Sequence, residues 1–212
     1  MTSPTKIMNI IDIFKTPLFT CNLDSTRHMV PKLEQYALEQ EKNKSGRNVS
    51  NIGGHQTPFL SPDKEPLYSE LLDLLMNEIK GVCVAMNYHA EKEITIGQCW
   101  ININRKGHLN MPHVHTNTDF AGVYFIKTDS NTPIGFKNPD PMIQQYEYRY
   151  TDFHEYNTEG HLYYPKNNDF IMFPSHIPHF VDENKTDIPR ISLAFNVKVT
   201  GSQYPIDEKL YD

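Results

Sequence analysis

Two histidines, His113 and His115, form a His-x-His pattern within residues 111–116. In an extended backbone, side chains two positions apart point to the same side, so both imidazoles can converge on one ion. The pattern lies between two apolar stretches that end near Asn104 and begin near Phe120, which predicts a position at the end of a strand. Because His-x-His alone is a weak signal, a metal site also needs a ligand from elsewhere in the chain.

Two later histidines, His176 and His179, are candidates for that third ligand. His179 begins an apolar strand-like stretch and is expected to be held rigidly, whereas His176 lies in the turn between Pro174 and Pro178. We therefore favour His179 and keep His176 as the alternative. Imidazole ligands suit Fe, Zn, Cu and Ni alike. We interpret the remaining histidines as surface or core residues, although His55, which follows two glycines, could also reach a site.

The first half of the chain carries the pattern of supporting elements. Residues 7–18 are apolar, β-branched and interrupted by Pro17, which is typical of an edge strand. Residues 24–41 and a segment that opens at 61–63 repeat apolar side chains every three to four positions and predict two helices. We expect the cluster 24–26 to cap the first helix and Gly81 to end the second. The polar, glycine-rich residues 43–54 predict a loop.

From about residue 93 the pattern changes to short apolar stretches separated by turn signals. Helices followed by a run of strands predict an α+β chain, mainly β, with a sandwich or jelly roll. We expect one domain over 1–212, with an N-terminal strand and supporting helices in 1–92, the jelly-roll core in 93–200 and a C-terminal tail in 201–212. The predicted strands cover residues 94–103, 120–126, 133–136, 144–151, 162–164, 170–173, 179–181 and 188–199.

Composition argues against several classes of partner. A formal charge of −6, without a sustained Lys/Arg cluster, disfavours nucleic acids and anionic membranes. The sequence shows neither a signal peptide nor an apolar run long enough to span a bilayer. Three cysteines without metal-type spacing predict free thiols in a reducing cytoplasm. An exposed N-terminal edge strand would also allow a homodimer.

The spacing of His113, His115, His179 and then Arg190 resembles the Fe(II)/2-oxoglutarate-dependent oxygenases. More narrowly, the chain is similar to an uncharacterised branch of that family found in bacteria and phages. The resemblance implies a double-stranded β-helix, a jelly roll with the N-terminal helices packed on one sheet. The stretches that carry it are residues 11–18, 112–115, 121–125, 168–170, 173–175 and 189–192.

The resemblance also implies the roles of the site residues. His113 and His115 take the paired-ligand position and His179 the distal one. Most of the family has two histidines and one carboxylate. Here His115 stands in the carboxylate's place, and the nearest acid is Asp119. A three-histidine site still suits Fe(II), but it leaves the metal site one unit more positive.

Arg190 is expected to hold the far carboxylate of 2-oxoglutarate, because a planar guanidinium can donate two parallel hydrogen bonds. Ser192 would help, since Arg-x-Ser places both side chains on one face of a strand. Further expected cosubstrate contacts are Asn102 and Asn104, on one strand face, and Tyr124 on the next strand. Taken alone, Arg190 could instead form a surface ion pair with Asp187 or Glu183.

The implied activity is oxidation of a substrate by O2, most simply a hydroxylation, with release of succinate and CO2. Its cofactors are Fe(II) and 2-oxoglutarate, with ascorbate as an accessory reductant. Two alternatives stay open: a three-histidine cupin-type dioxygenase or isomerase that does not use 2-oxoglutarate, and a non-catalytic metal-binding module. The substrate, a small molecule or a peptide, is not readable from the sequence. Residues 43–60 and the tyrosine-rich 139–160 are the expected lids.

Overall fold

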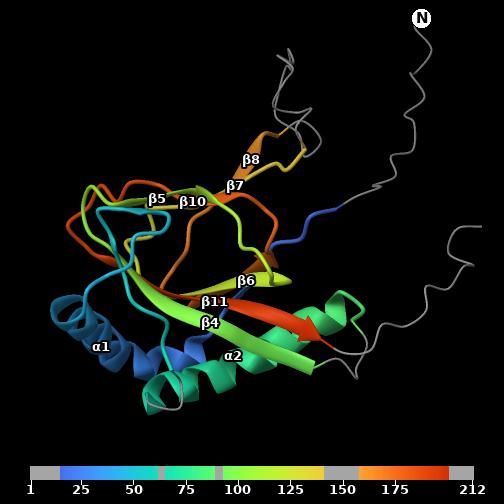
Figure 1. Ribbon diagram of the computed structural model, residues 1–212, viewed down its shortest axis with the longest axis horizontal. Coiled ribbons are helices and arrows are strands. Elements are labelled where there is room, and N and C mark those ends of the chain that lie inside the picture. The colour runs from blue at the N-terminus through green and yellow to red at the C-terminus, as the bar shows by residue number, and fades with distance from the viewer. Residues whose placement is uncertain (1–14, 62–64, 89–92, 141–157, 201–212) are drawn as a thin grey trace, which may run out of the picture.

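The computed structural model describes residues 15–61, 65–88, 93–140 and 158–200. Two antiparallel sheets lie face to face, and helices cover the outer face of one of them (Figure 1). This is the expected mainly β jelly roll with the N-terminal helices packed on one sheet. The helical elements are a 3-10 helix (Asp24–Met29), α1 (Val30–Asn43) and α2 (Pro66–Ala85).

The strands divide into a major and a minor sheet. The major sheet has the order β1-β9-β6-β11-β4-β3 and the minor sheet the order β2-β5-β10-β7-β8. The major strands are β1 (Phe19–Asn22), β3 (His55–Gln56), β4 (Glu93–Asn104), β6 (Phe120–Lys127), β9 (Asp169–Pro174) and β11 (Arg190–Thr200). The minor strands are β2 (Asn51–Ile52), β5 (Leu109–His113), β7 (Ile134–Lys137), β8 (Gly160–Tyr163) and β10 (His179–Val181).

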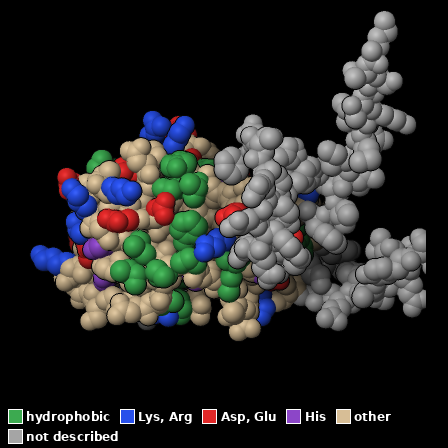
Figure 2. All heavy atoms as spheres, turned by 90° about the horizontal axis from the view of Figure 1, so that it is seen from above, with side chains coloured by type: hydrophobic (Ala, Val, Ile, Leu, Met, Phe, Trp, Pro, Cys, Tyr) green, Lys and Arg blue, Asp and Glu red, His purple; other side chains and the backbone are tan. Residues whose placement is uncertain are grey.

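The outer face of the minor sheet is not covered by any helix of the described chain. Hydrophobic side chains gather on this face among charged ones (Figure 2). Ile52, Met111 and Leu162, from β2, β5 and β8, are exposed. The part of the chain that the structure describes contains no helix long and apolar enough to cross a membrane.

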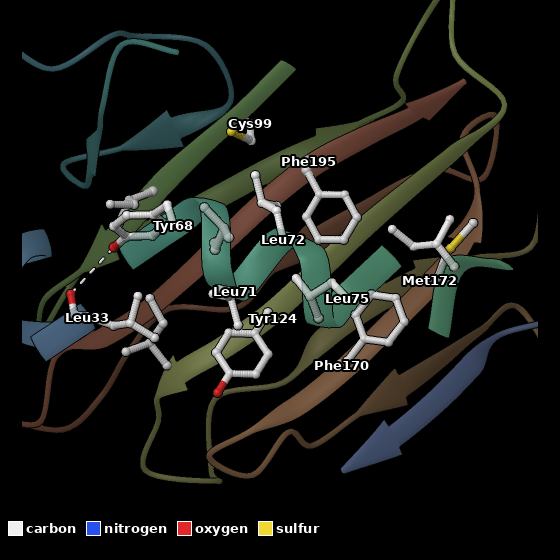
Figure 3. Close-up of a cluster of buried hydrophobic side chains, with 14 of the residues drawn as sticks. Leu33, Tyr68, Leu71, Leu72, Leu75, Cys99, Tyr124, Phe170, Met172 and Phe195 are labelled. Atoms are coloured by element: carbon white, nitrogen blue, oxygen red, sulfur yellow. Dashed lines mark hydrogen bonds between the residues drawn. The ribbon is translucent and has the colours of Figure 1, made fainter. Parts of the chain in front are cut away.

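The larger of two hydrophobic layers lies between the helices and the major sheet. Leu71, Leu72 and Leu75 of α2 pack against Phe170 and Phe195 of the sheet (Figure 3). Helical spacing places the three leucines on one stripe, and the period of two in a strand points alternate residues toward them. This burial fixes which face of each major strand looks toward the helices.

The second layer lies between the two sheets and contains Trp100, Val123, Phe125 and Phe173. Alternate residues of β11 face opposite sides of the major sheet. Its helix-facing side chains are Ile191, Leu193, Phe195 and Val197. The side chains that face the other sheet are mostly polar: Arg190, Ser192, Ala194 and Asn196. The interior between the sheets is therefore partly polar, and this is where a site can form.

Two predicted helix boundaries are wrong. The cluster 24–26 does not cap the first helix; it lies inside the 3-10 helix, whose N-cap is Leu23 and has no side-chain cap bond. The Thr26 hydroxyl instead donates to the carbonyl of Leu23 at 2.6 Å. Gly81 does not end α2, which continues to Ala85. The helix runs on because Val82 and Cys83 still bury their side chains in the core, which outweighs the low helix propensity of glycine.

The predicted strands depart from the structure at 15–18 and at β5, and one of them cannot be compared with it. The predicted strand 7–18 lies outside the described residues up to 14, and residues 15–18 are not a strand, because pairing with β9 begins at Phe19. The predicted strand 144–151 lies outside the described residues. Strand β5 was missed, because its sequence, Leu-Asn-Met-Pro-His, is polar and contains a proline. Proline is tolerated there, since pairing with β10 is broken by a register shift between His113 and Asn110.

Candidate metal centre

Three histidines converge between the two sheets. His113, the last residue of β5, pairs across the minor sheet with His179, the first residue of β10. Their ring centroids lie 4.3 Å apart. His115 follows two residues later, where its backbone N–H donates to the carbonyl of Ser175 at 3.0 Å. One ring nitrogen from each histidine lies within 4.8 Å of those from the other two. This distance suits three ligands of one ion.

Each of these rings has an oxygen acceptor at Nδ1. His113 Nδ1 lies 2.8 Å from the carbonyl of Met111, and His179 Nδ1 lies 3.0 Å from the carbonyl of Ile177. His115 Nδ1 lies 2.5 Å from Oδ1 of Asn196. Because an oxygen of this kind only accepts, each ring carries its proton on Nδ1 and presents the lone pair of Nε2. The protein thus orients three Nε2 atoms for a metal.

Burial keeps the three imidazoles neutral. It lowers the pKa of His113 and of His115 below the usual value. The pKa of His179 falls to about 3, through burial first and then the neighbouring charge of His113. A neutral imidazole is the form that binds a metal. The cluster is therefore in its ligating state at neutral pH.

The histidines face a cavity of about 250 Å³ between the sheets. Its walls combine aromatic residues, among them Trp100 and Phe173, with polar residues of β4 and β11. Two arginines, Arg47 and Arg190, line it as well. No Asp or Glu of the described chain lines it, although the protein as a whole carries a charge of −6. The cavity is thus a cationic site in an acidic protein.

Arg190 is buried in this cavity, with 3% of its surface exposed. Its guanidinium lies 5.1 Å from the ring centre of Phe125. Within the described residues it has no ion-pair partner, and its buried Nε has no hydrogen-bond partner. Burial lowers its pKa to about 10, which the charge of Asp129 only partly opposes. A buried cation without a counter-ion is costly, so this arrangement favours a bound anion.

Polar groups surround the Arg190 guanidinium. Ser192 lies two positions further along β11, on the same face, and pairs across the sheet with Asn102. Both line the cavity, and the buried Oδ1 of Asn102 has no hydrogen-bond partner in the described structure. The surface ion pair considered for Arg190 does not form, because the Asp187 carboxylate pairs with Lys106 at 3.1 Å.

Comparison with known proteins agrees with this geometry. The family described as "Putative 2OG-Fe(II) oxygenase" matches residues 98–196, which include the three histidines and Arg190. Residues 98–196 of the chain are thus similar to the 2OG-Fe(II) oxygenase family. No curated protein matches the sequence of this chain.

Solved structures share the fold of this chain at low sequence identity. A prolyl-4-hydroxylase from Pseudomonas putida has a TM-score of 0.61 and 12% identity, over 87% of this chain and 93% of that one. HygX from Streptomyces hygroscopicus, with nickel and 2-oxoglutarate bound, has a TM-score of 0.59 and 8% identity, over 86% and 83%. The viral collagen prolyl hydroxylase of Paramecium Bursaria Chlorella virus-1, a 2-oxoglutarate complex, has a TM-score of 0.52 and 11% identity, over 85% and 94%.

Two residues expected near the cosubstrate, Tyr124 and Asn104, do not line the cavity. Tyr124 pairs across the sheet with Leu193, and paired residues share a face, so it points toward the helices rather than into the cavity (Figure 3). There its hydroxyl lies 2.6 Å from Oγ1 of Thr26. Asn104 pairs with Arg190 across the sheet and shares its face, but it lies behind the cavity wall, where its Nδ2 donates to Oδ1 of the lining residue Asn110 at 2.8 Å.

Three further residues considered from the sequence also lie outside the histidine cluster. His176 is exposed and is not part of the histidine cluster. His55 pairs with Ile103, whose side chain packs against the helices, so His55 points away from the cavity. The acid nearest to the histidines in sequence, Asp119, accepts a hydrogen bond from the N–H of Val199 at 2.8 Å.

Sequence reasoning missed three residues that line the cavity, Asn196, Trp100 and Arg47. Strand alternation could have found two of them. Asn196 is on the same face of β11 as Arg190 and Ser192, and Trp100 is on the face of β4 that carries Asn102. Arg47 lies in a loop, and no periodic signal points to it.

Proposed function

We propose that the Nε2 atoms of His113, His115 and His179 hold one Fe(II) ion and that the protein oxidises its substrate with 2-oxoglutarate and O2. The most direct outcome is hydroxylation, with release of succinate and CO2. The observation that carries the proposal is the buried, unpaired cation of Arg190 in the same cavity as three Nε2 lone pairs. A metal site and an anion site side by side are what a keto acid cosubstrate requires.

The residues present fit both groups. Three neutral nitrogens, each fixed by an acceptor at Nδ1, form a preorganised ligand set. When bound, Fe(II) supplies the activation of O2 that is coupled to decarboxylation of 2-oxoglutarate. The chain itself contributes binding and orientation. Arg190 holds the far carboxylate of 2-oxoglutarate through two parallel hydrogen bonds, and Ser192 and Asn102 complete that contact.

Part of the cavity wall is apolar. Ala121, Val123 and Phe173 line it and are buried in the layer between the sheets. An apolar wall lowers the local dielectric, so the hydrogen bonds of Arg190 to a carboxylate are stronger there than in water. The cosubstrate is thereby held in one orientation.

The direct test is succinate release from purified protein supplied with Fe(II), ascorbate and 2-oxoglutarate. Anaerobic addition of 2-oxoglutarate to the Fe(II) protein should also produce a weak metal-to-ligand charge-transfer absorption. A three-histidine enzyme that does not use 2-oxoglutarate would bind the metal without that absorption. Protein purified without a His tag that holds no stoichiometric metal would favour the non-catalytic alternative.

The class of substrate follows from the fold only coarsely. A structure of HygX holds hygromycin B, a small molecule, and a prolyl hydroxylase from Trichoplax adhaerens holds a peptide fragment. We extend that range to this chain and propose a small molecule or a peptide as its substrate. We also propose action in a reducing cytoplasm, which the free thiols of Cys21, Cys83 and Cys99 support. The homodimer through an exposed N-terminal edge strand, expected at residues 7–18, stays a prediction, which sedimentation analysis would test.

A further inference from the structure

The cavity contains a second arginine, Arg47, that the proposed chemistry does not use. Arg47 lies on the 44–60 segment, and its guanidinium lies 4.1 Å from the ring centre of Phe59. Its buried Nη1 has no hydrogen-bond partner, and no carboxylate of the described residues forms an ion pair with it. A donor that is desolvated and unpaired is costly unless a ligand compensates for it.

The segment that carries Arg47 is fixed to both sheets. The Arg47 N–H donates to the carbonyl of Gln56 at 2.7 Å. The N–H of Thr57 donates to β4 at Ile101, at 3.0 Å, and that of Met111 in β5 donates to Ser50 at 2.8 Å. The segment is therefore a wall of the cavity with a defined shape, and the guanidinium has a defined place in it.

An aromatic wall leads from Arg47 to the histidines. The ring of Phe59 lies 6.0 Å from that of Trp100, and Trp100 lies 5.7 Å from His115. Phe59, Val49 and Val114 line the cavity and also expose much of their surface, with Val49 63% exposed. Aromatic and aliphatic side chains thus line the path from the outside to the histidines, with one cation beside it.

The net charge of the cavity also indicates a negatively charged ligand at Arg47. This argument rests on the proposed function, because it counts the charges of Fe(II) and 2-oxoglutarate. Fe(II), Arg190 and Arg47 together bring four positive charges into a cavity that no described Asp or Glu lines. The dianion of 2-oxoglutarate neutralises two of them. The excess that remains favours a substrate with negative charge of its own, and Arg47 is the cation not yet assigned to a ligand.

We propose that the substrate carries a carboxylate that binds Arg47 and, next to it, a flat apolar group that packs on Phe59 and Trp100. The carbon to be oxidised is then held near the histidines, at the far end of the same wall. The carboxylate can belong to a free organic acid or to an acidic residue of a peptide. Both sources present the same chemistry to the guanidinium.

Matched acid and amide probes test the proposal by binding alone. The protein is loaded with Ni(II), which does not turn over, and is studied with and without saturating 2-oxoglutarate, which occupies Arg190. Calorimetry then compares 3-phenylpropanoate with 3-phenylpropanamide, and the acetylated, amidated dipeptide Phe-Glu with Phe-Gln. The variant is Arg47→Gln. The matched control is Arg27→Gln, which removes the same charge from an exposed ion pair on the 3-10 helix.

We expect at least one acid to bind about tenfold more tightly than its amide, the effect of one charge-assisted hydrogen bond. Arg47→Gln should reduce that ratio to about one, while Arg27→Gln and the affinity for 2-oxoglutarate stay unchanged. A preference in the phenylpropanoate pair indicates a free organic acid as substrate, and a preference in the dipeptide pair indicates a peptide. A parent protein without any acid preference, or a preference that survives Arg47→Gln, overturns the inference. Failure of the parent to bind 2-oxoglutarate would instead refute the proposed function, and the acid–amide ratio would still be measured.

Discussion

Replacing Arg190 by methionine should have opposite effects on folding and on cosubstrate binding. In the absence of ligand, the guanidinium is a buried cation that forms no ion pair with the described residues, and its pKa is lowered from 12.5 to about 10. That shift corresponds to about 3 kcal/mol of unfavourable free energy for the charged form. Methionine removes the charge, retains much of the side-chain volume and gives up the contact with the Phe125 ring, which is worth about 1 kcal/mol.

The removed cost of the buried charge outweighs the lost contact with Phe125. The ligand-free Arg190→Met protein should therefore be about 1–2 kcal/mol more stable than the parent. In a chain of this size, that gain raises the melting temperature by roughly 3–6 °C. Binding should change in the other direction. Removing one partner of a buried charge pair costs about 3–5 kcal/mol, so the affinity for 2-oxoglutarate should fall by about two to four orders of magnitude.

Both quantities can be measured on one preparation. Thermal unfolding of the metal-free protein reports the stability, and anaerobic titration of the Fe(II) protein with 2-oxoglutarate reports the affinity. Arg27→Met, at an exposed ion pair, is the matched control and should change neither by much. The reasoning is refuted if Arg190→Met melts below the parent and still binds 2-oxoglutarate normally.

Three further predictions follow from the site and its surroundings. Asn196→Leu removes the acceptor of His115 Nδ1 and should weaken Fe(II) binding by about 10- to 100-fold in a metal titration, with little change in the fold. Because burial lowers the pKa of His179 to about 3, the unfolded chain binds more protons below about pH 6.5. Metal-free protein should therefore lose stability as the pH falls from 6.5 toward 3, by up to about 1.4 kcal/mol per pH unit for this histidine. Urea unfolding measures this loss, and equal urea midpoints at pH 7 and pH 5 would contradict it. Tyr124→Phe removes the contact with Thr26 and should lower the free energy of unfolding by about 1 kcal/mol. The affinity for 2-oxoglutarate should stay unchanged, because Tyr124 faces the helices; a weaker affinity would contradict that placement.

The sequence predicted those parts of the site that depend on spacing within one strand. His113 and His115 converge because they are two positions apart at the end of an extended segment, and Arg190 and Ser192 share a face for the same reason. The choice of His179 over His176 rested on local rigidity, and the structure brings His179 into the cluster while His176 is exposed.

Spacing within one strand does not predict which residues of neighbouring strands are paired, so the side chains whose position depends on that pairing were misplaced or missed. Whether Tyr124 faces the helices or the cavity is decided by its partner Leu193 on β11, and one sequence does not contain that register. The displacement of Asn104 from the cavity depends on Asn110, in a strand too polar to be recognised. Arg47 belongs to a loop whose position is set by hydrogen bonds to two sheets, so only the folded structure reveals it.

The third histidine changes how charge is distributed in the centre. A carboxylate ligand would neutralise one charge of Fe(II), but His115 is neutral, and the nearest acid, Asp119, is held away by the N–H of Val199. Anions that enter the cavity must therefore supply the negative charge, and each can bind more tightly when the metal is present. Thermodynamic linkage makes the effect reciprocal, so 2-oxoglutarate must strengthen metal binding by the same factor. In the proposed function, 2-oxoglutarate thus completes a centre of three neutral ligands and the buried cation of Arg190, and it links the metal site and the anion site into one functional unit.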